Sequence, residues 1–177
     1  MAFTDNGLEG PRLCLALITK ADRRVKIADH LLNITFPMIK DSKMLINIIE
    51  NLFLAAANAM TSLLIYERYR KNIDNFKDNF DSKFKIFTRL DYGFDNNTLK
   101  TIKDIRDIVV QHRKTSIEFR HKEDFVIITD DQYSYKKINH KLVKKYLNTI
   151  RDFVEETKLI LEHRIRDDYR RIGVKFK

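Results

Sequence analysis

The chain has 177 residues with 34 basic and 25 acidic side chains, a formal net charge of +9. This length suits one domain with a substantial core, and the single cysteine, Cys14, excludes an internal disulfide and suits a reducing cytoplasm. The basic excess favours polyanionic partners, chiefly nucleic acid or an anionic membrane surface, although a Lys-rich helical surface serves solubility equally well.

The first predicted helix runs from Arg12 to about Phe36. Its apolar residues alternate at spacings of three and four, which places them on one side of a helix, and Pro37 is expected to end or kink it. This first apolar stripe consists of Ile18, Ala21, Val25, Ala28 and Leu32.

The second predicted helix follows Asp41, which can cap it, and has the clearest pattern in the chain. Small and apolar residues surround more than one side, so we expect it to be the central, most buried element. Its uncharged run from Asn51 to Tyr66 is shorter than the roughly 20 residues that a membrane-spanning helix needs. We therefore expect no membrane partner. The stripe consists of Leu45, Ile49, Leu52, Ala56, Ala59, Leu63 and Tyr66.

A shorter helix is predicted to open at Asp74-Asn75, with aromatic residues at helical spacing on one side. Such a row can stack against a ligand or cover the core, and covering the core is the commoner role. The aromatic residues are Phe76, Phe80, Phe84 and Phe87.

The next predicted helix spans about Thr98 to Lys114, with Leu99, Ile102, Ile105 and Val109 facing inward. Residues 125–129 and 133–137 then have the alternation of a β-hairpin around Asp130-Asp131.

Asn139 is expected to cap the last helix, and Gly173 to terminate it. The inward stripe of this helix consists of Val143, Tyr146, Ile150, Phe153, Thr157 and Ile160.

Together these elements predict an all-α fold: a four-helix bundle with an extra short helix and a small β-hairpin before the last helix. Only 4 Gly and 2 Pro leave few breaks between elements. We expect a tail over residues 1–10, a single helical domain over residues 11–172 and a basic tail over residues 173–177.

Most sequence signatures of catalysis are missing. The chain has no Gly-rich phosphate loop, Cys pair or Gly-x-Ser-x-Gly motif, and no two histidines have the i, i+4 spacing of a helical metal site. We therefore expect neither a metal nor a cofactor. The acidic pairs Glu155-Glu156 and Asp167-Asp168 lie among basic residues and are interpreted as solvated surface or helix-end charges.

One remaining group of residues has side chains suited to catalysis. It consists of Arg106, Asp107 and His112 on the helix before the hairpin. Arg106 and His112 are six residues apart, about 120° around a helix, with Val109 between them. Both side chains could therefore converge over Val109, on a face that a second helix or subunit would cover.

These residue types suit RNA cleavage. A histidine near neutral pKa can take a proton from the ribose 2′-hydroxyl or give one to the leaving 5′ oxygen, and an arginine can hold the scissile phosphate. Because one histidine cannot easily be base and acid together, a symmetric dimer would supply the second copy. Asp107 would orient Arg106 or the partner's histidine. Further RNA contacts are expected from Lys103, Arg113 and Lys114.

The arrangement resembles the HEPN superfamily (higher eukaryotes and prokaryotes nucleotide-binding). That family has a helical bundle in which arginine and histidine are separated by four to six residues, often with Asn, Asp or His after the arginine. Here the separation is five, and Asp107 follows Arg106. The segment 115–126 also looks like the region after the motif in uncharacterised archaeal relatives.

The resemblance implies an endoribonuclease that needs no metal and acts as a homodimer, with RNA or a nucleotide as ligand. Toxin members of the family imply a nucleotidyltransferase as partner. Catalytically silent members imply the alternative, a helical module that binds RNA, a nucleotide or a partner protein without cleaving. Arg23 and Arg24 stand at similar spacings before His30, so the motif recurs in the first helix. The later site has the polar residue after its arginine, whereas Val25 follows Arg24.

Overall fold

The structure is a computed structural model that describes residues 9–114, 118–121, 124–128 and 135–171. The expected C-terminal tail, Gly173 and the hairpin turn at Asp130-Asp131 lie outside these ranges. The elements in chain order are α1 (Glu9–His30), η1 (Leu31–Thr35), α2 (Phe36–Ile39), α3 (Lys43–Tyr69), α4 (Phe80–Arg89), α5 (Asn96–Lys114), β1 (Glu118–His121), β2 (Asp124–Ile128), β3 (Tyr135–Ile138) and α6 (His140–Arg171).

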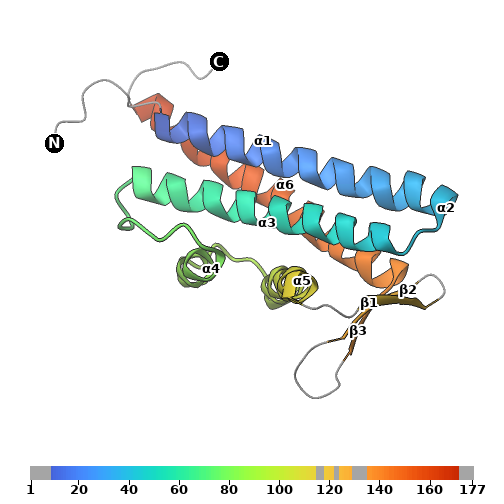
Figure 1. The fold of residues 1–177 in the computed structure, drawn as a ribbon. Coiled ribbons are helices and arrows are strands. Elements are labelled where there is room, and N and C mark those ends of the chain that lie inside the picture. The colour runs from blue at the N-terminus through green and yellow to red at the C-terminus, as the bar shows by residue number, and fades with distance from the viewer. Residues whose placement is uncertain (1–8, 115–117, 122–123, 129–134, 172–177) are drawn as a thin grey trace.

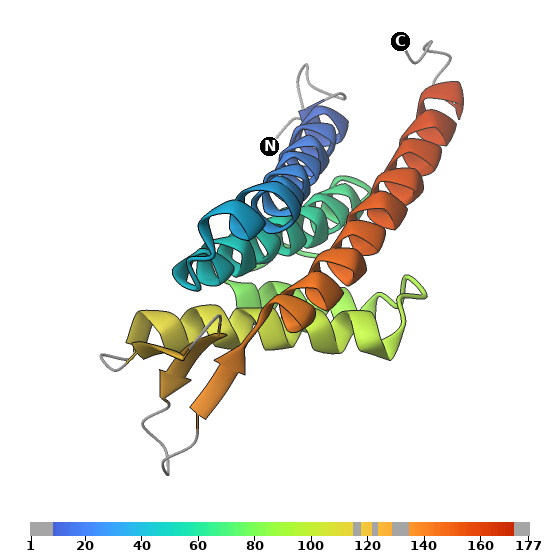
Figure 2. The same ribbon diagram turned by 90° about the vertical axis from the view of Figure 1, so that its right-hand side faces the viewer.

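The described part of the chain is mostly helical, with a small antiparallel sheet before the last helix, as the sequence predicts. Helices α1, α3 and α6 run across the view in Figure 1, whereas α4 and α5 are seen nearly end-on. The turned view in Figure 2 shows α5 lying across the long helices. The expected alignment of four helices in one bundle is therefore not confirmed.

Helix α3 is the central element, as predicted. It packs against α1, α4, α5 and α6, and all seven residues of its predicted stripe are buried. Cys14 of α1 is fully buried in the same core, and this burial raises the pKa of its thiol to about 12. The N-cap residue of this helix is Ser42 rather than the expected Asp41, although Asp41 Oδ1 just before it accepts a hydrogen bond from the Lys43 amide at 2.9 Å.

The first helix differs from its prediction at both ends. It begins at Glu9, two residues inside the expected tail, with Pro11 in its first turn, where a missing amide costs no hydrogen bond. Pro37 does not end it at Phe36. The chain widens into the π-helical turn η1 and continues through α2 to Ile39. A π-helical turn changes the hydrogen-bond register, and this allows a proline in the next turn.

Helix α4 begins at Phe80 rather than at Asp74-Asn75. The Asn79 side chain accepts a hydrogen bond from the Ser82 amide at 2.8 Å and is the true cap. Phe76 precedes this helix. Phe87 is buried, and its ring packs edge-on against Phe153 of α6 at a centroid distance of 5.8 Å, so the aromatic row does cover the core.

The sheet has one strand more than predicted. Strands β2 and β3 pair antiparallel, which confirms the hairpin, and β1 pairs with the other edge of β2. The Asn139 side chain caps α6 by accepting from the Leu142 amide at 2.9 Å, as expected. Near the end of the α6 stripe, Leu161 is fully buried in place of Ile160.

Helix α3 is the one helix in the described residues that is long and apolar enough to cross a membrane. Of its most apolar window, 61% is buried inside the protein. This burial fits the core helix of a folded domain, which meets the same criteria of length and composition.

We expect the replacement of α3 core leucines to be costly. Leu52 and Leu63 are fully buried, so either Leu→Ala change should lower the free energy of unfolding by about 2–5 kcal/mol, measured by urea denaturation. Leu159 of α6 is 66% exposed, and Leu159→Ala should change it by less than about 0.5 kcal/mol. Equal effects at the buried and exposed positions would contradict this assignment of the core.

Candidate nucleic-acid interface

Helix α5 carries all the residues that the sequence predicts for RNA binding and cleavage. It starts after Asp95, whose side chain accepts from the Thr98 amide at 2.6 Å. One side of α5 is buried in the protein core. Its buried residues are Thr101, Ile102, Ile105, Ile108 and Val109. Val109, which the sequence places between Arg106 and His112 on a face that a second helix or subunit would cover, is only 2% exposed, so the core of its own chain covers that face.

Arg106 is held by two carboxylates. Its Nη1 donates to Asp107 Oδ1 at 2.9 Å, and its Nη2 donates to Asp81 Oδ2 at 2.8 Å. The guanidinium carbon also lies 6.0 Å from the ring centre of Phe80. The hydrogen bond to Asp107, with the nearby negative charges, raises the pKa of Arg106. The Arg106 side chain is 28% exposed, so it borders solvent while its position is fixed.

The other predicted RNA contacts lie on the same side of α5 as Arg106. At about 100° per residue, Lys103, Arg113 and Lys114 fall within about 80° of it around the axis. All three side chains are exposed. Arg113 has a long ion pair with Glu50 at 3.7 Å, whose carboxylate is on α3. The outward side of α5 is therefore a basic surface, which we call the α5 basic face: Lys103, Arg106, Arg113 and Lys114.

His112 lies on a different side of the helix. Its ring meets the ring of Phe125 on β2 edge-on, at a centroid distance of 6.3 Å. Arg106 instead reaches the first turn of α4, through Asp81. The structure thus brings Arg106 and Asp107 together but directs Arg106 and His112 to different neighbours within one chain. The side-chain oxygen of Gln111, next to His112, is buried without a hydrogen-bond partner.

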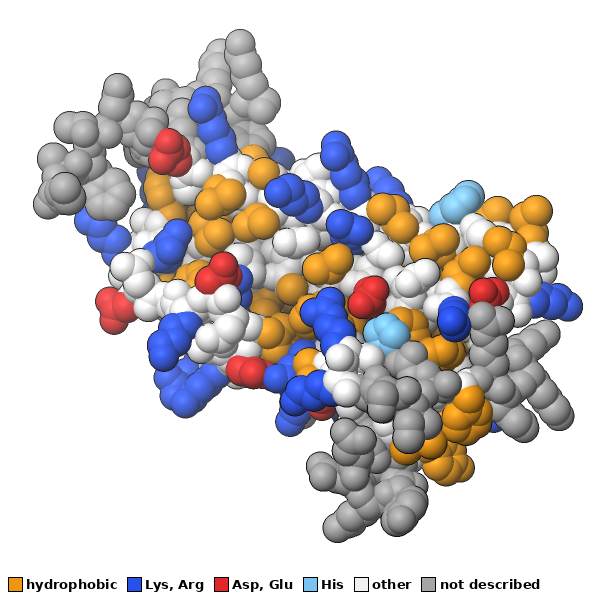
Figure 3. Space-filling view, viewed as in Figure 1, with side chains coloured by type: hydrophobic (Ala, Val, Ile, Leu, Met, Phe, Trp, Pro, Cys, Tyr) orange, Lys and Arg blue, Asp and Glu red, His pale blue; other side chains and the backbone are white. Residues whose placement is uncertain are grey.

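Basic charge also occurs away from α5. On the face shown in Figure 3, Lys and Arg side chains are spread over the whole view, with acidic and apolar side chains between them. The net charge of +9 therefore does not by itself identify α5 as the surface that binds nucleic acid. Within the ranges that the structure describes, no three His, Cys, Asp or Glu side chains form a group able to hold a metal.

A second polar cluster was not expected from the sequence. Asp168, interpreted as a solvated surface or helix-end charge, does lie near the end of α6, but its side chain is only 13% exposed and accepts from Tyr66 at 2.8 Å and Arg70 at 2.6 Å. These partners are about 100 positions apart in the chain, so no local pattern could reveal them. Glu155 and Glu156 are exposed, as predicted.

Comparison with known proteins identifies no relative: no family model matches the chain, and no curated protein or solved structure matches it either.

We expect Arg106 to contribute little to stability. Both of its ion pairs are partly solvated, with Asp81 at 72% and Asp107 at 37% exposure, and such pairs are worth about 1 kcal/mol or less each. Arg106→Ala should therefore leave the free energy of unfolding within about 2 kcal/mol of wild type in urea denaturation. A larger loss would assign Arg106 a structural role.

Proposed function

We propose that this chain is an RNA-binding domain of HEPN type that cleaves RNA as a homodimer without a metal. The observation that carries the proposal is the α5 basic face, four cations on one side of a helix whose other side is fixed in the core. Phosphate contacts from such a face hold an RNA strand regardless of its sequence. The four-helix bundle of that family, with α1, α3, α5 and α6 as its helices, belongs to the same proposal.

Arg106 is suited to the scissile phosphate. A guanidinium has five N–H donors, and the contacts with Asp81 and Asp107 use two of them. The remaining donors can meet phosphate oxygens, and the fixed position lets them stabilise the charge that develops in the transition state. Asp107 orients the guanidinium, which is the role that the sequence predicts for it.

Cleavage requires His112 near Arg106, and a two-fold axis can supply it. His112 of the partner subunit would then stand opposite Arg106, with one histidine taking the proton of the 2′-hydroxyl and the other protonating the leaving 5′ oxygen. The 2′ oxygen attacks phosphorus as the bond to the 5′ oxygen breaks. The products carry a 2′,3′-cyclic phosphate and a 5′-hydroxyl.

The second candidate function is a binding module without catalysis. Two observations favour it: both terminal nitrogens of Arg106 already contact carboxylates, and His112 packs edge-on against Phe125 of its own chain. The α5 basic face would then hold RNA or a nucleotide, or dock an acidic partner protein.

A cleavage assay on mixed RNA in the presence of EDTA separates the two. If the nuclease proposal holds, wild type should release products with 2′,3′-cyclic phosphate ends and leave DNA intact. His112→Ala should abolish cleavage with RNA affinity nearly unchanged, whereas Arg106→Ala should weaken both. His30→Ala is the matched control and should behave as wild type. RNA retention without cleavage would identify the binding module, and cleavage that needs added magnesium would reject the mechanism.

Assembly is tested separately. Light scattering at micromolar concentration should give the mass of a dimer, because each site needs histidines from two chains. A strict monomer that still cleaved RNA would rule out the shared site, and a monomer without activity would again favour the binding module.

A further inference from the structure

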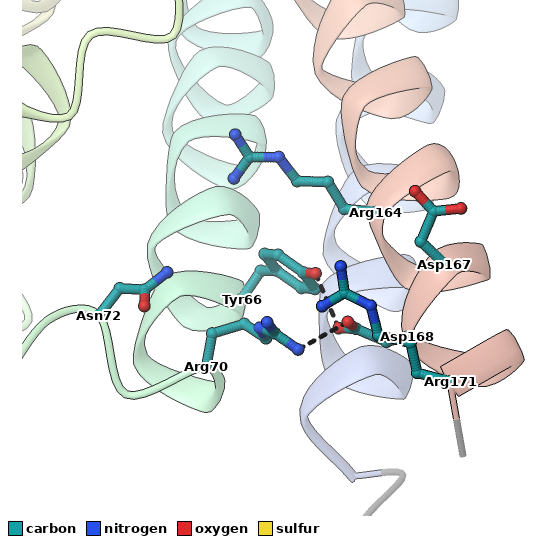
Figure 4. Close-up of a pocket in the computed structure, with 7 residues that line it drawn as sticks. All are labelled: Tyr66, Arg70, Asn72, Arg164, Asp167, Asp168 and Arg171. Atoms are coloured by element: carbon teal, nitrogen blue, oxygen red, sulfur yellow. Dashed lines mark hydrogen bonds and ion pairs between the residues drawn. The ribbon is translucent and has the colours of Figure 1, made fainter.

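A second polar site lies at the other end of the protein from the sheet, where α3 ends beside the last turns of α6. Figure 4 shows its side chains, which come from these two helices and from the segment after α3, with Tyr66 and Arg70 meeting Asp168. They surround a cavity of about 210 Å³. Its lining is polar and consists of Tyr66, Arg70, Asn72, Arg164, Asp167, Asp168 and Arg171.

One arginine of this cavity is fixed by Asp168. Oδ1 of that carboxylate accepts from Arg70 Nη1 at 2.6 Å, and Oδ2 accepts from the Tyr66 hydroxyl at 2.8 Å. Burial and the bond to Asp168 raise the pKa of Tyr66, so its hydroxyl stays protonated and keeps donating. Both carboxylate oxygens are thus occupied, and the other N–H groups of Arg70 remain available.

A second arginine is fixed by the buried Glu67, whose side chain is 6% exposed. Oε1 accepts from Arg164 Nη1 at 2.5 Å and from the Tyr92 hydroxyl at 2.8 Å, while Oε2 accepts from Asn72 at 2.5 Å. The Arg164 guanidinium carbon also lies 5.2 Å from the ring centre of Tyr92. The Arg164 guanidinium is therefore held by a hydrogen bond from Nη1 and by the Tyr92 ring against one of its faces. Its other N–H groups take no part in these contacts.

The third arginine has no carboxylate partner among the described residues. Arg171 lines the cavity, is exposed, and forms no ion pair in that part of the chain. The remaining lining carboxylate, Asp167, is within 3.4 Å of His163 and 3.8 Å of Arg170, two neighbours on α6 outside the cavity lining. The cavity thus presents three guanidinium groups: Arg70 is paired with Asp168, Arg164 is paired with Glu67, and Arg171 has no described carboxylate partner.

We propose that this cavity binds a phosphate monoester group. Three guanidinium groups on one small volume suit an ion with three terminal oxygens and two negative charges, because each fork can contact two oxygens. A carboxylate has only two oxygens and would leave one arginine unmatched. The volume lies below the roughly 300–1,000 Å³ of pockets that enclose drug-sized ligands, so it admits an end phosphate but not a whole molecule of that size. The ligand is therefore a molecule that carries a terminal phosphate monoester.

This proposal is independent of the α5 basic face. Helix α5 leads into the sheet, whereas the cavity lies at the ends of α3 and α6 on the opposite side of the molecule (Figure 1). Loss of RNA cleavage in the His112 variant would leave this site unaffected, and loss of phosphate binding would leave the nuclease proposal unaffected.

The test is an NMR titration of the full chain with inorganic phosphate, following the side-chain Nε–H signals of its arginines, with sodium chloride at equal ionic strength as control. We expect saturable shifts for Arg70, Arg164 and Arg171. Arg171→Ala should weaken binding at least fivefold, and because this side chain has no described partner, the variant should fold normally. Arg166→Ala is the matched control, because Arg166 is an exposed arginine of α6 outside the cavity lining, and this change should alter the affinity less than twofold.

The source of the phosphate is resolved with two further ligands. Adenosine monophosphate and a short 5′-phosphorylated RNA should each compete with inorganic phosphate if they carry the group that the cavity takes, and the same RNA with a 5′-hydroxyl should compete at least tenfold more weakly. Shifts that chloride reproduces, or equal effects of the Arg166 and Arg171 variants, would overturn the proposal, because they would indicate general attraction to a basic surface.

Discussion

The packing of α3 against both α1 and α6 is the constraint on which the rest of the structure depends. Both α1 and α3 bury small residues, and this lets their backbones approach closely. At Gly10 a Cβ atom would lie 2.6 Å from the ring of Tyr69, so this one position at the start of α1 has no room for a side chain beside the end of α3. Fixing α3 in this way also fixes its last turn. Tyr66, Glu67 and Arg70 therefore meet α6 in a defined geometry.

Much of this core could be predicted from hydrophobic spacing alone. The α3 stripe and the inward residues Ile102, Ile105 and Val109 are buried as the period of 3.6 indicates, because apolar burial dominates where one helix side faces a core. Local capping was predictable at Asn139 but not at Asn79, since Asp74-Asn75 offered an equally good signal. The crossing of α5 over the long helices depends on tertiary packing, which no local pattern encodes.

The candidate site was predicted in its residues but not in its geometry. Helical angles placed Arg106 and His112 on either side of Val109, which was also part of the inward stripe. Val109 is buried in the core of its own chain, because exposing it would lose its hydrophobic stabilisation, and the two side chains contact different neighbours. The cavity beside Asp168 had no sequence signal, because its hydrogen bonds join residues 98 and 102 positions apart.

In both arginine sites carboxylates hold a guanidinium group, but the two sites differ in how far these carboxylates are exposed to solvent. The carboxylates that hold Arg106 are partly solvated, so their ion pairs add little stability, and their main effect is to orient the arginine. Glu67 is buried, and removing its partners would leave a buried charge unpaired. Such a change typically lowers the free energy of unfolding by about 3–5 kcal/mol. Arg164 is therefore both a structural partner and a ligand donor, whereas Arg106 is free of the structural role. Functional effects at Arg106 can accordingly be interpreted directly, while those at Arg164 need a stability measurement beside them.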